Sequence, residues 1–168
     1  MLFEQISKKA QSIKARCKTC DPYKIAEQLN IKVRFAEDFV RLKGMYTVVA
    51  RNRFIILSRS LDEQTARIVL AHEIGHDRLH FDLAKQTGFS DITLYDMNTR
   101  PEYEANIFAA ELLLDTDEVL ELIYDGRDAL ETAKILGSDV NLVALKVASL
   151  TKQGYQFRLQ DYRSDFLK

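Results

Sequence analysis

Residues 60–80 read SLDEQTARIVLAHEIGHDRLH, and this stretch is the strongest indication of the fold. Its apolar residues recur at helical spacing, and Ser60 stands three residues before Glu63 in the form of a capping box, which predicts the start of a long helix. The chain has three histidines, and all of them lie here: His72, His76 and His80. Such a cluster in one predicted helix indicates a functional site on this helix.

The predicted helix contains an H-E-x-x-H sequence, His72-Glu73-Ile74-Gly75-His76. Four-residue spacing puts the two imidazoles on one helix face, about 6 Å apart along the axis, so both can reach one zinc ion with bonds of about 2.1 Å. Glu73 can reach a water on that ion without binding the ion, and is therefore the predicted general base. The alternative is a pair of hydrogen-bonded core histidines that have this spacing by chance. Average amino-acid composition makes such a chance match rare.

A catalytic zinc site normally has three protein ligands, so a third must come from another element. Residues 101–113, PEYEANIFAAELL, predict a second helix with glutamates in its first turn. Glu102 is the preferred ligand, because small residues on its stripe let the two helices approach closely. Glu104 remains the alternative and is expected at the rim. Asn106 lies one turn after Glu102, where it can hydrogen-bond a ligating group.

Other polar residues near the motif are weaker candidates for metal binding. His80 lies about 12 Å along the helix from His72, too far to bind the same ion, and is expected at the surface or beside a ligand. Four aspartates are further candidates, although turns or solvent suit them better: Asp77, Asp82, Asp91 and Asp96.

The rest of the chain predicts an α+β domain with a small sheet and several helices. Helices are expected at 2–16, 22–29, 127–136 and 139–151. Strands are expected at IKVRF, MYTVVA and RFIILS, the last two as a hairpin, with further short strands at ITLY (92–95) and YQFRL (155–159). We expect a single domain, 1–168, divided into N-terminal helices (1–30), the sheet (31–60), the metal-site helices (61–125) and a C-terminal helical buttress (126–168).

Composition excludes several classes of function. Lys plus Arg (24) nearly equals Asp plus Glu (25), so no strong field attracts nucleic acid or an anionic membrane. No run approaches the roughly 20 apolar residues that span a bilayer, and no signal-peptide core is present, which predicts a cytoplasmic protein. Cys17 and Cys20 form a lone C-x-x-C that we expect to be reduced. Direct DNA binding through residues 127–151 remains a weaker alternative, based on three lysines among acidic residues: Lys134, Lys146 and Lys152.

Two stretches carry a resemblance to a known family: NRFIILSRSLDEQTARIVLAHEIGHDRLH (52–80) and EYEANIFAAELLL (102–114). Together they resemble the ImmA/IrrE family of zinc metallopeptidases, relatives of the thermolysin-like gluzincins, over about residues 22–125. The resemblance implies a zincin-like fold, in which a small, mostly antiparallel sheet packs on the HExxH helix, flanked by further helices. It also implies one zinc ion bound by His72, His76 and Glu102, the glutamate of an E-x-x-x-N arrangement, with Glu73 as catalytic base.

Family members often cleave a helix-turn-helix repressor encoded nearby, frequently in phages or mobile elements, so the resemblance implies regulation of transcription through such a substrate. An extended peptide is then expected to add to a strand edge near Arg53–Leu57. A metal-containing regulatory module that captures the partner without cutting it is the alternative function. Two departures stand out: members commonly have Met-Pro where this chain has Leu114-Asp115-Thr116, and residues after 126 match only loosely.

Overall fold

A computed structural model describes residues 2–39, 42–82 and 99–157. Within these ranges the chain is α+β, as the sequence predicted. The elements in order are α1 (Leu2–Cys17), α2 (Pro22–Gln28), β1 (Ile31–Ala36), β2 (Gly44–Val49), β3 (Asn52–Ser58), α3 (Glu63–Leu79), α5 (Arg100–Leu113), α6 (Thr116–Tyr124), α7 (Ala129–Ile135) and α8 (Val140–Lys152). The strand expected at 92–95 lies outside the described residues, and residues 155–157 of the other expected strand are not in a sheet.

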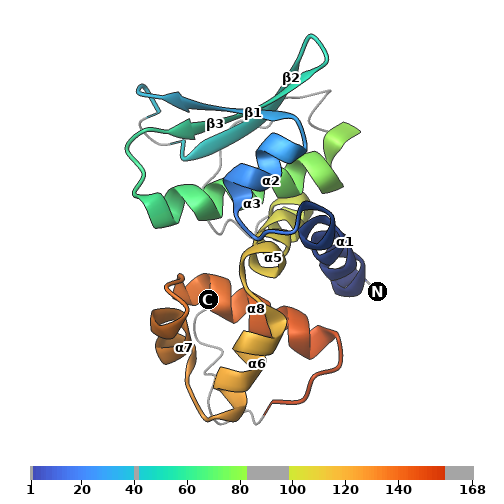
Figure 1. Ribbon diagram of the computed structural model, residues 1–168, viewed down its shortest axis with the longest axis vertical. Helices are drawn as coiled ribbons and strands as arrows, with labels where there is room; N and C mark the ends of the chain where they lie inside the picture. The colour runs from blue at the N-terminus through green and yellow to red at the C-terminus, as the bar shows by residue number, and fades with distance from the viewer. Residues whose placement is uncertain (1, 40–41, 83–98, 158–168) are drawn as a thin grey trace.

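The elements form a stack, with the sheet at one end and α6, α7 and α8 at the other (Figure 1). The helix of the H-E-x-x-H motif, α3, lies in the middle of this stack: it contacts β2 and β3 on one side and α5 on the other. A helix covered on two sides must be buried around most of its circumference. Accordingly α3 is buried at every position from Ile68 to Asp77, so the motif lies in the interior.

The sheet has the strand order β1-β3-β2 in the described part of the chain. β2 and β3 form the expected antiparallel hairpin, but β1 runs parallel to β3, so the sheet is mixed rather than mostly antiparallel. The prediction of a free edge at Arg53–Leu57 was wrong, because these residues belong to β3, which is hydrogen-bonded on both sides. Among the described strands the edges are β1 and β2.

Five of the described helices start after an aspartate cap. Asp21 caps α2 as expected, accepting a hydrogen bond from the Tyr23 amide at 3.2 Å. α3 is capped by Asp62, whose Oδ1 accepts from the Thr65 amide at 2.9 Å, so the expected cap at Ser60 was wrong. Asp115 caps α6, so the segment in which the chain departs from Met-Pro starts a separate helix.

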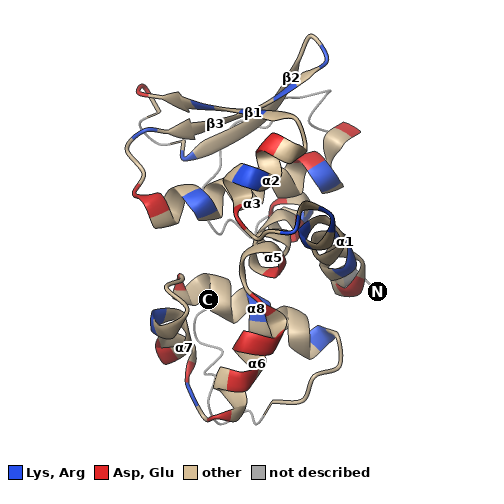
Figure 2. Ribbon diagram, in the orientation of Figure 1, with Lys and Arg blue, Asp and Glu red and all other residues tan. Residues whose placement is uncertain are grey.

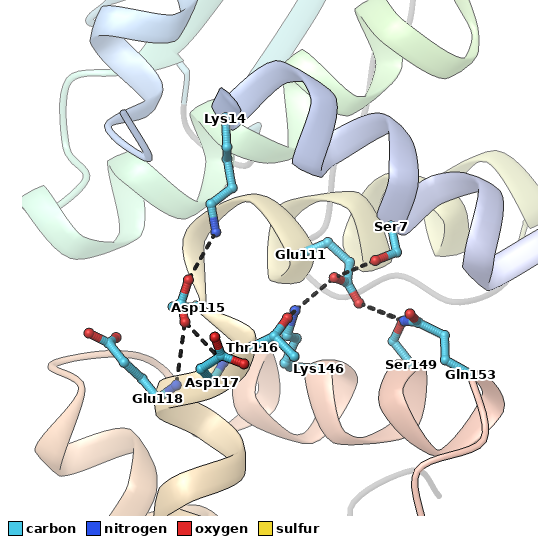
Figure 3. Close-up of polar contacts among 10 residues, drawn as sticks. All are labelled: Ser7, Lys14, Glu111, Asp115, Thr116, Asp117, Glu118, Lys146, Ser149 and Gln153. Atoms are coloured by element: carbon cyan, nitrogen blue, oxygen red, sulfur yellow. Dashed lines mark hydrogen bonds and ion pairs between the residues drawn. The ribbon is translucent and has the colours of Figure 1, made fainter. Parts of the chain in front are cut away.

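The C-terminal helices are held against α5 by a buried polar cluster around Glu111 (Figure 3). Glu111 is fully buried, and it accepts hydrogen bonds from Lys146 Nζ at 2.7 Å, Ser149 Oγ at 2.7 Å and Ser7 Oγ at 3.0 Å. These donors come from α8 and α1, so both helices are tied to the element that carries Glu102.

Among the described residues, no helix is long and apolar enough to cross a membrane.

Candidate metal centre

Three side chains from α3 and α5 converge on one point. His72 Nε2 lies 2.9 Å from His76 Nε2 and 3.1 Å from Glu102 Oε2, and His76 Nε2 lies 3.3 Å from Glu102 Oε1. All three residues are buried, and one donor atom of each lies within 4.8 Å of the others. The structure therefore brings to the histidine pair the glutamate that packing and resemblance favoured.

The convergence depends on a close approach of the two helices at Gly75. A Cβ atom added there would lie 3.2 Å from Ala105 Cα and 3.2 Å from Phe108 Cδ1. Since the Ala105 Cα is backbone, it cannot turn aside as a side chain would. Ala105, one of the small residues expected on the Glu102 stripe, thus packs against Gly75.

Replacing Gly75 by Ala should weaken metal binding by forcing α3 and α5 apart. Alanine favours the helix itself by up to about 1 kcal/mol, but overpacking at the contact costs about 1–3 kcal/mol. Zinc affinity, measured by competition with a chelator, should fall in Gly75→Ala. It should stay unchanged in Gln64→Ala, a change at an exposed position of the same helix. Undiminished zinc affinity in Gly75→Ala would show that the helix spacing does not set the cluster.

Each histidine of the pair has a further hydrogen-bond partner behind it. Asn106 Oδ1 lies 2.8 Å from His72 Nδ1, the contact that its spacing predicted. His80, expected at the surface or beside a ligand, is largely buried, with its Nδ1 3.2 Å from His76 Nδ1. Glu104 lies outside the three-residue cluster and instead contacts His80, at 2.9 Å, and Arg100, at 2.6 Å.

Glu73 faces the sheet instead of α5. It is fully buried, and neither of its carboxylate oxygens has a hydrogen-bond partner among the described residues. A Cβ atom added to Gly44 of β2 would lie 3.0 Å from Glu73 Oε1, so the strand passes directly over the carboxylate. Burial raises the pKa of Glu73 well above its usual range, the charge of Glu102 adds to the rise, and the Tyr46 backbone amide opposes it.

Two of the three donor groups, His76 and Glu102, have pKa values that favour the protonation states that bind metals. Burial lowers the pKa of His76 to about 4, because the charged imidazolium is poorly solvated there. For Glu102, burial acts to raise the pKa, but the hydrogen bonds of His72 and His76 outweigh it and lower the pKa to about 2. At neutral pH, His76 is therefore an uncharged imidazole and Glu102 a carboxylate, as metal coordination requires.

Asp77 differs from its sequence prediction. Instead of lying in solvent or a turn, it is buried, and its carboxylate accepts from Tyr46 Oη at 2.7 Å and from Arg53 and Arg78. Tyr46 thereby connects β2 to α3 one turn beyond Glu73. The position of Asp77, four residues after Glu73 on the same helix face, was the feature of the sequence that could have indicated its burial. Of the other aspartates, Asp82 is exposed, and positions 91 and 96 lie outside the described residues.

The DNA-binding alternative loses one of its three lysines. Lys146 is fully buried against Glu111, so it cannot face a phosphate backbone. Neighbouring α6 carries acidic side chains instead (Figure 2), among them Asp117 and Glu118 in its first turn. Lys134 and Lys152 stay exposed, so the described C-terminal helices carry less positive surface charge than the sequence indicated.

A buried His-His-Glu cluster between two helices, with a carboxylate beside it, is the arrangement of a metallopeptidase of the zincin type. Comparison with known families agrees: the model of the IrrE N-terminal-like domain, peptidase family M78, matches residues 26–149. The chain belongs to this family, which confirms the resemblance and extends it into α8, beyond the range expected from the motifs. An uncharacterized immunity region protein 2 of Bacillus phage phi105 is 33% identical over 112 residues, which cover 67% of this chain and 70% of that protein.

Proposed function

We propose that this chain is a zinc-dependent endopeptidase in which Glu73 acts as the general base. Its zinc ligands in this proposal are His72, His76 and Glu102. One observation carries the proposal: three buried donor atoms converge beside a fully buried carboxylate that has no hydrogen-bond partner among the described residues. An unpaired buried carboxylate is costly to keep, and a role in chemistry accounts for it.

The cluster fits zinc by chemistry and by size. Imidazole nitrogens and a carboxylate oxygen are ligands that zinc prefers, and three of them leave a fourth position open. Tetrahedral bonds of about 2.1 Å place ligand atoms about 3.4 Å apart. The separations of 2.9, 3.1 and 3.3 Å need to widen by only a few tenths of an ångström.

Each residue of the site then has a separate role in peptide hydrolysis. Zinc, when bound, supplies Lewis acidity that lowers the pKa of water to about 7 and polarises a carbonyl. The Glu73 carboxylate takes a proton from the attacking water and passes it to the leaving nitrogen. The group must hold the proton between the two transfers. Asn106 orients His72 by accepting from its Nδ1.

The substrate in this proposal lies along β2. The Ser58 amide of β3 donates to the Lys43 carbonyl at 2.9 Å, which fixes the alternation of the hairpin. Gly44, Tyr46 and Val48 therefore direct their peptide groups away from β3, toward an edge that the described residues leave unpaired. An extended peptide that adds to this edge passes beside Glu73, since Gly44 lies over that carboxylate.

For the natural substrate we propose a helix-turn-helix repressor, so that cleavage relieves repression in the cytoplasm. The support is the phage relative, which is described as an immunity region protein. The nearly neutral charge of the chain agrees with a partner that itself carries the DNA-binding surface.

Removing the metal tests the function directly. Purified protein should contain about one zinc ion per chain, and incubation with a candidate repressor should give fragments detectable by mass spectrometry. Treatment with a chelator should stop cleavage, and added zinc should restore it. Absence of zinc binding by a well-folded sample would contradict the proposal. A stable complex with an intact repressor, unchanged by a chelator, would favour the capture module instead.

A further inference from the structure

A line of polar side chains leads from His76 to the protein surface. His76 Nδ1 lies 3.2 Å from His80 Nδ1, His80 Nε2 lies 2.9 Å from Glu104 Oε2, and Arg100 Nε donates to Glu104 Oε1 at 2.6 Å. The side chains of His80 and Glu104 are 9% and 12% exposed, whereas that of Arg100 is 77% exposed. The line therefore begins in the interior and ends in solvent.

The distances permit one consistent assignment of protons when His76 binds a metal through Nε2. Its proton must then be on Nδ1, which donates to His80 Nδ1. His80 Nδ1 is consequently unprotonated, and the proton of His80 is on Nε2, from which it donates to Glu104. The second oxygen of Glu104 accepts from Arg100. Each contact of the line thus joins one donor to one acceptor.

We propose that His80 is a positioning residue, held by Glu104, that fixes the ring angle and the tautomer of His76 for zinc binding. This inference rests on the proposed function, and it gives His76 a counterpart of the Asn106 contact made by His72. The spacing of four residues on α3 is what places the two rings together, with centroids 5.3 Å apart. Hydrogen-bond partners of metal-binding histidines typically change metal affinity by about 10- to 100-fold.

Two amide substitutions separate positioning from packing. In His80→Asn the side-chain oxygen takes the place of Nδ1 and still accepts from His76. In His80→Gln the amide takes the place of Nε2, so it keeps a contact with Glu104 but offers no acceptor to His76. Zinc affinity, measured by chelator competition, should fall about 10- to 100-fold in His80→Gln and stay within about threefold of wild type in His80→Asn. Thermal unfolding of the metal-free proteins checks that both variants fold.

Each outcome decides the question. Wild-type affinity in His80→Gln, or equal losses in both variants, overturns the positioning role. If wild-type protein itself binds no zinc, the proposed function fails separately. Nitrogen NMR of the metal-free protein then reads the contact of His80 with Glu104: a proton on His80 Nε2 supports the hydrogen-bonded line, and an Nε2 without a proton overturns it.

Discussion

Replacing Glu73 by Gln should abolish peptide cleavage while leaving zinc bound. The amide has nearly the same shape as the carboxylate but cannot accept the proton of the attacking water, so kcat/KM should fall by about 10²–10⁴-fold. Metal content should not change, because Glu73 lies outside the cluster of ligand atoms and faces β2. The rate should be measured on a peptide that spans the cleavage site of the repressor, with zinc content determined on the same samples.

Glu63→Gln is the matched control, since Glu63 is an exposed glutamate in the first turn of the same helix. It should cleave at the wild-type rate. Cleavage by Glu73→Gln above about a tenth of wild type would contradict the role of general base. Loss of zinc from that variant would instead assign Glu73 as a ligand.

Removing the cation of the Lys146–Glu111 pair should have the largest effect on stability. Both side chains are fully buried and their charged atoms lie 2.7 Å apart. Lys146→Met leaves the Glu111 charge in the core without its cation, and breaking such a pair costs about 3–5 kcal/mol. That is a large share of the roughly 5–15 kcal/mol by which a domain is stable. Urea unfolding, followed by circular dichroism, measures the loss.

Lys152→Met removes an exposed lysine from the same helix and should change the free energy of unfolding by less than about 0.5 kcal/mol. Adding Glu111→Gln to Lys146→Met should recover part of the loss, because the neutral amide retains hydrogen bonds to Ser7 and Ser149 but carries no charge. A cost below about 1 kcal/mol for Lys146→Met would show that water reaches the pair.

The candidate His-His-Glu cluster was predictable because the residue spacing within each of its two helices is local. Helical spacing alone placed His72 and His76 on one face, and the same spacing on the second helix favoured Glu102 over Glu104 and put Asn106 within reach of a ligand. The structure brings these groups together as expected. What spacing could not decide was which side of α3 meets the sheet, so the position of Gly44 over Glu73 was not foreseen.

Features that depend on distant partners were missed. Strand pattern does not reveal pairing direction, so the parallel pairing of β1 with β3, and the central place of Arg53–Leu57, were not expected. Lys146 looked like a surface lysine because its partner, Glu111, lies 35 residues away in sequence. Asp77 was misjudged for the same reason, since Tyr46 and Arg53 reach it from the sheet.

The contact between Gly75 and Ala105 also bears on the entropy of metal binding. Bringing Glu102 to the histidines closes a long loop of chain, and that closure has an entropic cost. Because α3 and α5 pack together within one turn of the ligands, helix packing contributes to meeting this cost. A small zinc finger, by contrast, folds only when its ion binds. In the proposed site, helix packing therefore helps to position the ligands, and less of the binding free energy of an ion would be needed for loop closure.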